Sequence, residues 1–165
     1  MDMAMPMALY TSAISLAWIY ADIIPPLAVL ALALLAGGPL LLYRMQRRLF
    51  NDSDGKLGVA ELWRMGIITI FLGTIFTLMV TYGVLEYVRP SYIYDQIQIV
   101  IDTYKHVPEM KDSELVEALE YMTENNMAPS AFDYALNMFL LTNTSGMAMG
   151  ALTAVYAAKS HRNNY

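Results

Sequence analysis

Long stretches without ionisable side chains constrain most strongly what this chain can fold into. Residues 134–158 carry no formal charge, and residues 65–85 carry none either. Across residues 3–43 the single acidic or basic side chain is Asp22. A water-soluble helix of such length needs a polar face, whereas a helix that crosses a bilayer needs about 20 mostly apolar residues. The sequence therefore predicts an all-α integral membrane helical bundle, with residues 1–165 forming a single membrane domain.

Four transmembrane helices are expected in this bundle. They cover residues 4–23, 26–43, 62–86 and 131–158. The Pro25-Pro26 pair separates the first two, because proline lacks an N–H and clashes with the preceding turn but is favourable at the first turn of a new helix. The last one follows Ser130-Ala131-Phe132-Asp133, which has the spacing of a capping box. A re-entrant hairpin formed by residues 1–43 is the alternative for the first half of the chain.

An acidic soluble insert, residues 91–130, precedes the last span. Apolar residues recur at helical spacing over residues 93–104, which predicts an amphipathic helix that ends before Pro108. A second helix is expected to start at Asp112 or Ser113, since both residue types are favourable N-caps. The insert is therefore predicted to be a pair of helices.

Basic side chains predict how the bundle is oriented. Between the second and third spans lie Arg44, Arg47, Arg48, Lys56 and Arg64, and after the last span come Lys159 and Arg162. The insert has Lys105 and Lys111 against eight acidic residues. Because basic residues are enriched on the cytoplasmic side, we expect both termini in the cytoplasm of a bacterium, the spans in its inner membrane, and the insert outside.

The second half of the chain has a pattern seen in a known family. Gly58-Val-Ala-Glu-Leu-Trp-Arg-Met-Gly66 is followed by a long span rich in Ile, Thr and Phe, by Tyr87-Val-Arg-Pro90, and by the acidic insert before a Gly-rich final span. From Gly58 to the C-terminus this pattern resembles the domain-of-unknown-function family 4199, small four-span membrane proteins mostly of Bacteroidota. Residues 1–50 resemble the family in hydropathy alone. The resemblance implies topology and location, and it carries over no functional residues.

Two stripes of small residues are the clearest constellation in the spans. The final span repeats one every four residues, at Gly146, Gly150, Ala154 and Ala158. The third span has a matching stripe of Thr69, Gly73, Thr77 and Thr81. In lipid, small residues let two helix backbones approach closely. We expect these stripes to pack the bundle internally, and a homodimer or partner interface is the alternative.

Polar side chains in the final span form a second candidate site. They are Asn137, Asn143, Thr144 and Ser145. Because the bilayer core offers no water, an amide at that depth needs a partner. The structural interpretation is a hydrogen bond across a helix interface. The functional interpretation is a polar lining for a substrate or an ion.

Three acidic residues are expected at the outer boundary of the membrane: Asp22, Glu86 and Asp133. Together they could supply oxygen ligands to a cation. The simpler interpretation is a solvated rim, because exposed charges stay hydrated. We accordingly predict no metal site, no cofactor and no catalytic residue.

Composition narrows the function classes further. The chain has no cysteine, which excludes disulfides and thiolate chemistry, and its net charge of -5 disfavours a nucleic-acid partner. We expect a non-enzymatic accessory or scaffolding membrane protein that contacts a membrane partner, or copies of itself, through its spans and insert. A small oligomeric transporter or channel component, lined near Asn143, is the alternative.

Overall fold

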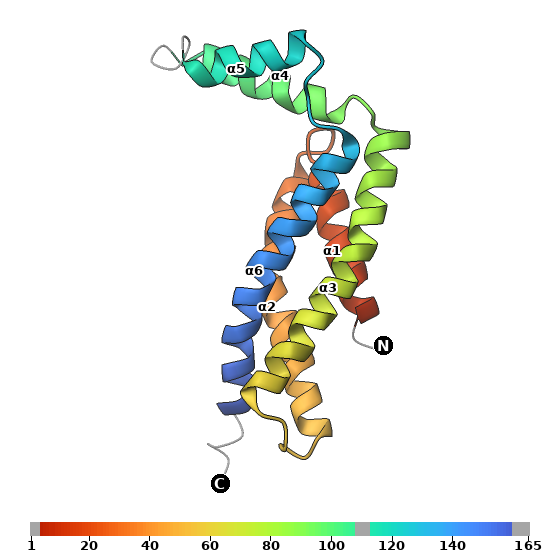
Figure 1. The fold of residues 1–165 in the computed structure, drawn as a ribbon, viewed down its shortest axis with the longest axis vertical. Coiled ribbons are helices and arrows are strands. Elements are labelled where there is room, and N and C mark those ends of the chain that lie inside the picture. The colour runs from red at the N-terminus through yellow and green to blue at the C-terminus, as the bar shows by residue number, and fades with distance from the viewer. Residues whose placement is uncertain (1–3, 108–112, 160–165) are drawn as a thin grey trace. The chain divides into compact units, whose positions relative to one another are not determined.

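The computed structural model describes residues 4–107 and 113–159, and every regular element within them is a helix. In chain order the elements are α1 (Ala4–Ile19), α2 (Pro26–Asp52), α3 (Val59–Gly83), the π-helical turn η1 (Val84–Val88), α4 (Tyr92–Lys105), α5 (Glu114–Glu124) and α6 (Ala131–Lys159) (Figure 1). The predicted all-α class is confirmed.

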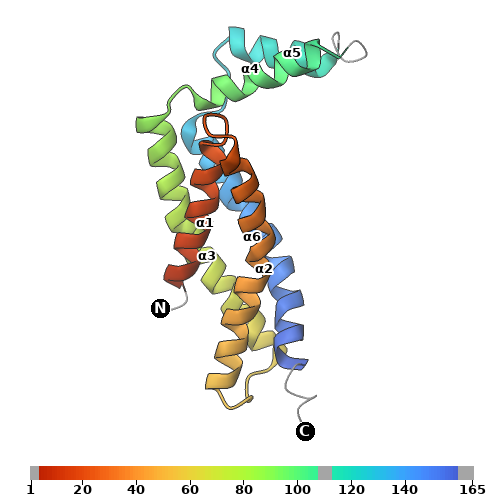
Figure 2. The ribbon, with the colours of Figure 1, turned by 180° about the vertical axis from the view of Figure 1, so that it is seen from behind.

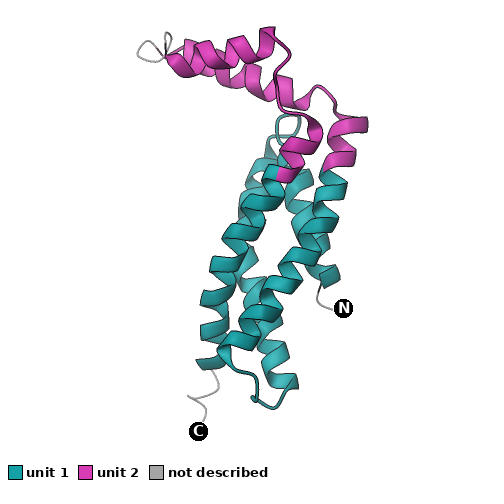
Figure 3. Cartoon of the chain, viewed as in Figure 1, with its two compact units in different colours: residues 1–81, 137–165 teal, residues 82–136 magenta. Residues whose placement is uncertain are grey.

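Two compact units make up the chain (Figure 3). Unit 1 comprises residues 1–81 and 137–165, and so contains α1, α2 and most of α3 and α6. Unit 2 comprises residues 82–136 and contains η1, α4, α5 and the first turns of α6. The helices of the predicted insert thus belong to a unit that also includes the adjoining ends of two long helices.

In the part of the chain that the structure describes, three helices are long and apolar enough to cross a membrane: Pro26–Asp52, Val59–Val88 and Ala131–Lys159. The first predicted span is shorter than expected. α1 has 16 residues and ends at Ile19, which at 1.5 Å per residue gives about 24 Å, less than the roughly 30 Å of hydrocarbon in a bilayer. It ends there because Asp22 Oδ1 accepts a hydrogen bond from the amide of Ile23 at 2.9 Å, inside a turn that leads to Pro25.

The second predicted span, by contrast, is longer than expected. α2 runs to Asp52 rather than to residue 43, so Arg44–Arg48, which were expected to follow the second span, are part of its helix. Arginine, glutamine, methionine and leucine are good helix formers, and charge alone does not end a helix. Pro39 lies inside α2, and the Tyr10 hydroxyl of α1 donates to the carbonyl of Leu34 in the preceding turns.

An apolar core joins the helices of unit 1. One cluster of buried residues contains Phe50, Leu62, Ala154 and Ala157, from α2, α3 and α6. A second contains Met7, Leu42 and Ile70, from α1, α2 and α3. Figure 2 shows the same helices from behind, with α1 against the first part of α2.

Large apolar side chains also cover the outside of this unit. Val29, Leu40, Met79 and Leu141 are among those left exposed on α2, α3 and α6. A soluble protein rarely exposes so large a contiguous apolar surface. The outward faces of these helices are therefore suited to lipid.

Within unit 2, α4 and α5 pack against each other as a helical hairpin. Ile101 and Val116 are buried between them, and the Ser113 side chain accepts from the amide of Val116 at the start of α5. Lys105 forms an ion pair with Glu120. The hydrogen bond from the Lys105 ammonium to this carboxylate raises the pKa of Lys105. The prediction of two helices here is confirmed, and the segment around Pro108 and Asp112 lies outside the described residues.

Candidate functional site

A buried amide joins three helices in unit 1. Gln46 of α2 is 2% exposed, and its Nε2 donates to the carbonyls of Leu62 in α3, at 3.3 Å, and Gly150 in α6, at 3.1 Å. Gly66 makes room for it, because a Cβ there would lie 2.7 Å from Nε2. Oε1 has no hydrogen-bond partner among the described residues. Interhelical hydrogen bonds of this kind hold helices together in lipid.

Two further side chains donate to backbone carbonyls of α6. Trp63 Nε1 of α3 donates to Met147 at 3.0 Å, and Arg47 Nη1 of α2 donates to Ala157 at 2.8 Å. The second bond satisfies a carbonyl in the last turn of α6, where a cation is also favoured by the helix dipole. Together with Gln46, these donors hold α6 against α2 and α3 at several positions along its axis.

Asn143 lies in the interface between α6 and α3. Its Nδ2 donates to Thr74 Oγ1 at 2.9 Å and to the carbonyl of Phe139 at 2.8 Å, and the side chain is 7% exposed. The other predicted lining residues do not join it. Thr144 and Ser145 are exposed and donate to carbonyls of their own helix, and Asn137 is exposed.

The small-residue stripe of α6 lies against α2 and α3. A Cβ on Gly146 would be 3.0 Å from Ile70, and one on Gly150 would be 3.6 Å from Trp63. Ala154 is fully buried, and Ala158 packs against the cluster around Phe50 and Leu62. This face of α6 is occupied within the chain.

The stripe on α3 has a different partner, α1. A Cβ on Gly73 would lie 3.1 Å from the amide nitrogen of Ala8. Hydroxyl pairs continue the contact: Thr77 with Thr11 at 2.6 Å and Ser12 at 3.2 Å, and Thr81 with Ser15 at 2.6 Å. Thr69, the remaining member, lines a small cavity of about 10 Å³ beside Gln46.

The three predicted rim acids occupy separate settings. Asp22 belongs to unit 1, whereas Glu86 and Asp133 belong to unit 2. Asp133 completes the predicted capping box, accepting from Ser130 Oγ at 2.6 Å while its own amide donates to that oxygen at 3.1 Å. Glu86 is exposed in η1. Among the described residues no three His, Asp or Glu side chains gather as metal ligands.

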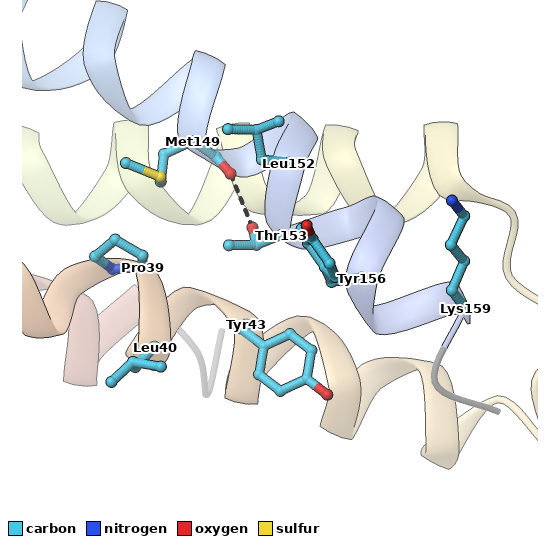
Figure 4. A pocket seen from close by; sticks show the side chains of 8 residues that line it. All are labelled: Pro39, Leu40, Tyr43, Met149, Leu152, Thr153, Tyr156 and Lys159. Carbon is cyan, nitrogen blue, oxygen red and sulfur yellow. Dashed lines mark hydrogen bonds between the residues drawn. The ribbon is translucent and has the colours of Figure 1, made fainter. Parts of the chain in front are cut away.

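An apolar groove of about 750 Å³ runs between α2 and α6 (Figure 4). From α2 it is lined by Pro39, Leu40 and Tyr43, and from α6 by Met149, Leu152, Thr153, Tyr156 and Lys159. Thr153 donates to the carbonyl of Met149 in its own helix, at 3.0 Å. Lys159 lies at one end and supplies the groove's charge.

Sequence reasoning missed the donors that join the helices. Gln46 and Arg47 fall within the run Arg44–Arg48, which was expected to lie beyond the end of the second span. The sequence did hold a signal for a continued helix. Leu42, Gln46 and Phe50 are spaced four residues apart, which places Gln46 on the same helix face as two apolar side chains. No comparable sequence pattern indicated the groove between α2 and α6.

Comparison with known proteins places the chain in a family. Searches of curated proteins and of solved structures gave no match. A model of the family described as "Protein of unknown function (DUF4199)" matches residues 6–163. The match includes the first half of the chain, where the sequence pattern had indicated a likeness in hydropathy alone. Because it covers nearly the whole chain, this protein belongs to the DUF4199 family.

Proposed function

We propose that this protein is a non-enzymatic accessory or scaffolding component of the bacterial inner membrane, acting through its helical hairpin. The observation that carries the proposal is the surface of that hairpin. Ile99 of α4 and Leu115 and Tyr121 of α5 are 50%, 48% and 59% exposed although they lie outside the three long apolar helices. Exposed apolar side chains in an otherwise acidic hairpin favour contact with a partner protein or a second copy.

The interior of unit 1 supports the same proposal. Its buried amides are used to join helices: Gln46 bonds two carbonyls, and both hydrogens of Asn143 Nδ2 have acceptors. A polar path for a solute needs groups that are free to exchange partners with that solute. The geometry of Asn143 therefore favours a structural role over the lining of a transporter or channel.

Orientation in the membrane follows from charge. Arg44, Arg47 and Lys159 lie in the C-terminal parts of α2 and α6. By the positive-inside rule this end faces the cytoplasm. We propose that both termini are cytoplasmic and that the hairpin lies on the opposite side of the inner membrane, where a partner protein would meet it.

Affinity purification from native membranes in mild detergent, with quantitative mass spectrometry and an in-detergent mass, tests the scaffolding role. The test variant is the double substitution Leu115→Ser and Tyr121→Ser, and the matched control is Ala118→Ser, an exposed position on the same helix. We expect the unmodified chain and the control to retain a stoichiometric partner or a second copy, and the double variant to lose it.

A strictly monomeric protein that brings down nothing would overturn the proposal. If the double variant instead loses affinity for protein-free liposomes, then the hairpin lies in the lipid headgroups. Solute flux into liposomes that is abolished by Asn143→Leu would revive the transporter alternative.

A further inference from the structure

The groove between α2 and α6 has the size and lining of a ligand site. Its volume of about 750 Å³ falls within the roughly 300–1,000 Å³ of small-molecule pockets. Leu40, Met149 and Leu152 provide apolar walls, and no acidic side chain is among the described residues that line it. The hydroxyl of Thr153 is engaged with carbonyls of its own helix.

One end of this groove is basic. Lys159 lies there (Figure 4), and Arg47 reaches the same turn of α6 through the carbonyl of Ala157. The hydroxyls of Tyr43 and Tyr156, both in the lining, have no hydrogen-bond partner among the described residues. The Lys159 ammonium is complementary to a phosphate, and the two tyrosines lie further along the groove (Figure 4).

A second transmembrane helix is a poor occupant. Close packing of helices in lipid uses small residues, and the small-residue stripe of α6 already lies against Ile70, Trp63 and the core around Leu62. The groove instead presents bulky Tyr, Met and Leu side chains. A thin, flexible chain fits such a lining better than a helix does.

We infer that this groove binds an anionic glycerophospholipid, with one acyl chain between α2 and α6 and the phosphate on Lys159. Basic pockets between helices on the cytoplasmic side are suited to acidic headgroups. Neutral glycerophospholipids have the same acyl chains as anionic ones, but they have no net negative charge to attract the Lys159 ammonium. The inference concerns a different surface from the hairpin and does not depend on the scaffolding role.

Native mass spectrometry of the purified full chain, titrated with dioleoylphosphatidylglycerol or with neutral dioleoylphosphatidylcholine, tests this. We expect the anionic lipid to bind more tightly, and Lys159→Gln to lower its affinity about tenfold, as the loss of one charge-assisted contact predicts. Lys159→Arg keeps the charge and should retain binding. Lys56→Gln is the charge control, because Lys56 is exposed, lies near Asp54 and is not in the lining.

Leu40→Trp provides a second, independent arm. Leu40 is exposed, so the larger side chain fills the groove without entering the core, and we expect it to displace the anionic lipid. Leu141→Trp adds the same bulk on exposed α6 surface outside the lining. Equal affinity for the two lipids, or anionic-lipid binding that survives both Lys159→Gln and Leu40→Trp, would overturn the inference. So would a dimer that Leu40→Trp dissociates, since the groove would then hold a second copy.

Discussion

Single side chains decide how the helices of unit 1 fit together. Gln46 is the clearest case, because one amide bonds α3 and α6 from α2, and its place depends on the missing Cβ of Gly66. Such a contact is specific in a way that apolar packing is not. A leucine in place of Gln46 could pack among the apolar side chains, but it could not form the hydrogen bonds that fix the register of the three helices.

Gly66→Ala is expected to destabilise the protein. The new Cβ would lie 2.7 Å from Gln46 Nε2, so the amide must move away from the carbonyls of Leu62 and Gly150, and overpacking of this kind costs about 1–3 kcal/mol. Thermal unfolding in detergent measures the change. Gly83→Ala is the control, because nothing lies within 4 Å of a Cβ there. Equal unfolding temperatures for the two variants would contradict the assigned role of Gly66.

Asn143→Leu is expected to lower stability by about 0.6 kcal/mol, the average measured for hydrogen bonds between transmembrane helices. The substitution removes the hydrogen bond to Thr74 Oγ1 across the helix interface and the one to the carbonyl of Phe139 in the same helix. A double-mutant cycle with Thr74→Val isolates the contact, since the two losses should not add. Ser145→Ala, which removes an exposed hydroxyl bonded to its own helix, should be nearly neutral. Additive effects of Asn143→Leu and Thr74→Val would show that the pair is not coupled.

At the scale of elements, two kinds of interface hold the protein together. Within unit 1, α1 joins α3 through hydroxyl pairs and a close approach at Gly73, whereas α6 receives longer donors from Trp63, Gln46 and Arg47. Within unit 2, α4 and α5 meet through apolar side chains and the ion pair of Lys105 with Glu120. The first kind suits a water-free interior and the second suits an aqueous one.

The hairpin of α4 and α5 should lose stability at alkaline pH. The hydrogen bond to Glu120 raises the pKa of Lys105 in the folded state. A raised pKa contributes stability below the unfolded lysine value of about 10.4, and that contribution is lost as the pH rises through the folded value. Glu120→Gln removes the partner carboxylate. The unfolding temperature of this variant should therefore change less than that of the unmodified chain as the pH rises through the pKa of Lys105. Circular dichroism melts at several alkaline pH values measure both, and parallel pH profiles would refute the role of the pair.

At the scale of the whole molecule, charge and hydropathy predicted more than side-chain pairing did. Uncharged runs located the three long helices, and the capping box at Asp133 marked the start of α6. The end of α2 was missed because the run after Tyr43 is basic, although helix propensity there is high. Which stripe would meet which helix was also missed. Spacing identifies a face of a helix, but the partner of Gly73 depends on tertiary packing.

Single introduced cysteines test the proposed orientation, because the chain has none of its own. Glu117→Cys lies on α5, and Lys56→Cys lies between α2 and α3. A membrane-impermeant maleimide should label the first in intact spheroplasts and the second only after permeabilisation, because the proposed orientation puts the basic end in the cytoplasm. The reverse pattern would invert the topology, and labelling of both positions in intact spheroplasts would rule out a membrane span between them.

The side-chain donors that bond to backbone carbonyls of α6 have a mechanical consequence. They reach carbonyls at Met147, Gly150 and Ala157 from two neighbouring helices. Sliding α6 by one residue, about 1.5 Å along its axis, would stretch all these bonds together, so the resistance is cooperative. Any push or pull on α6 along the membrane normal is therefore shared with α2 and α3, and the three helices transmit force as one body.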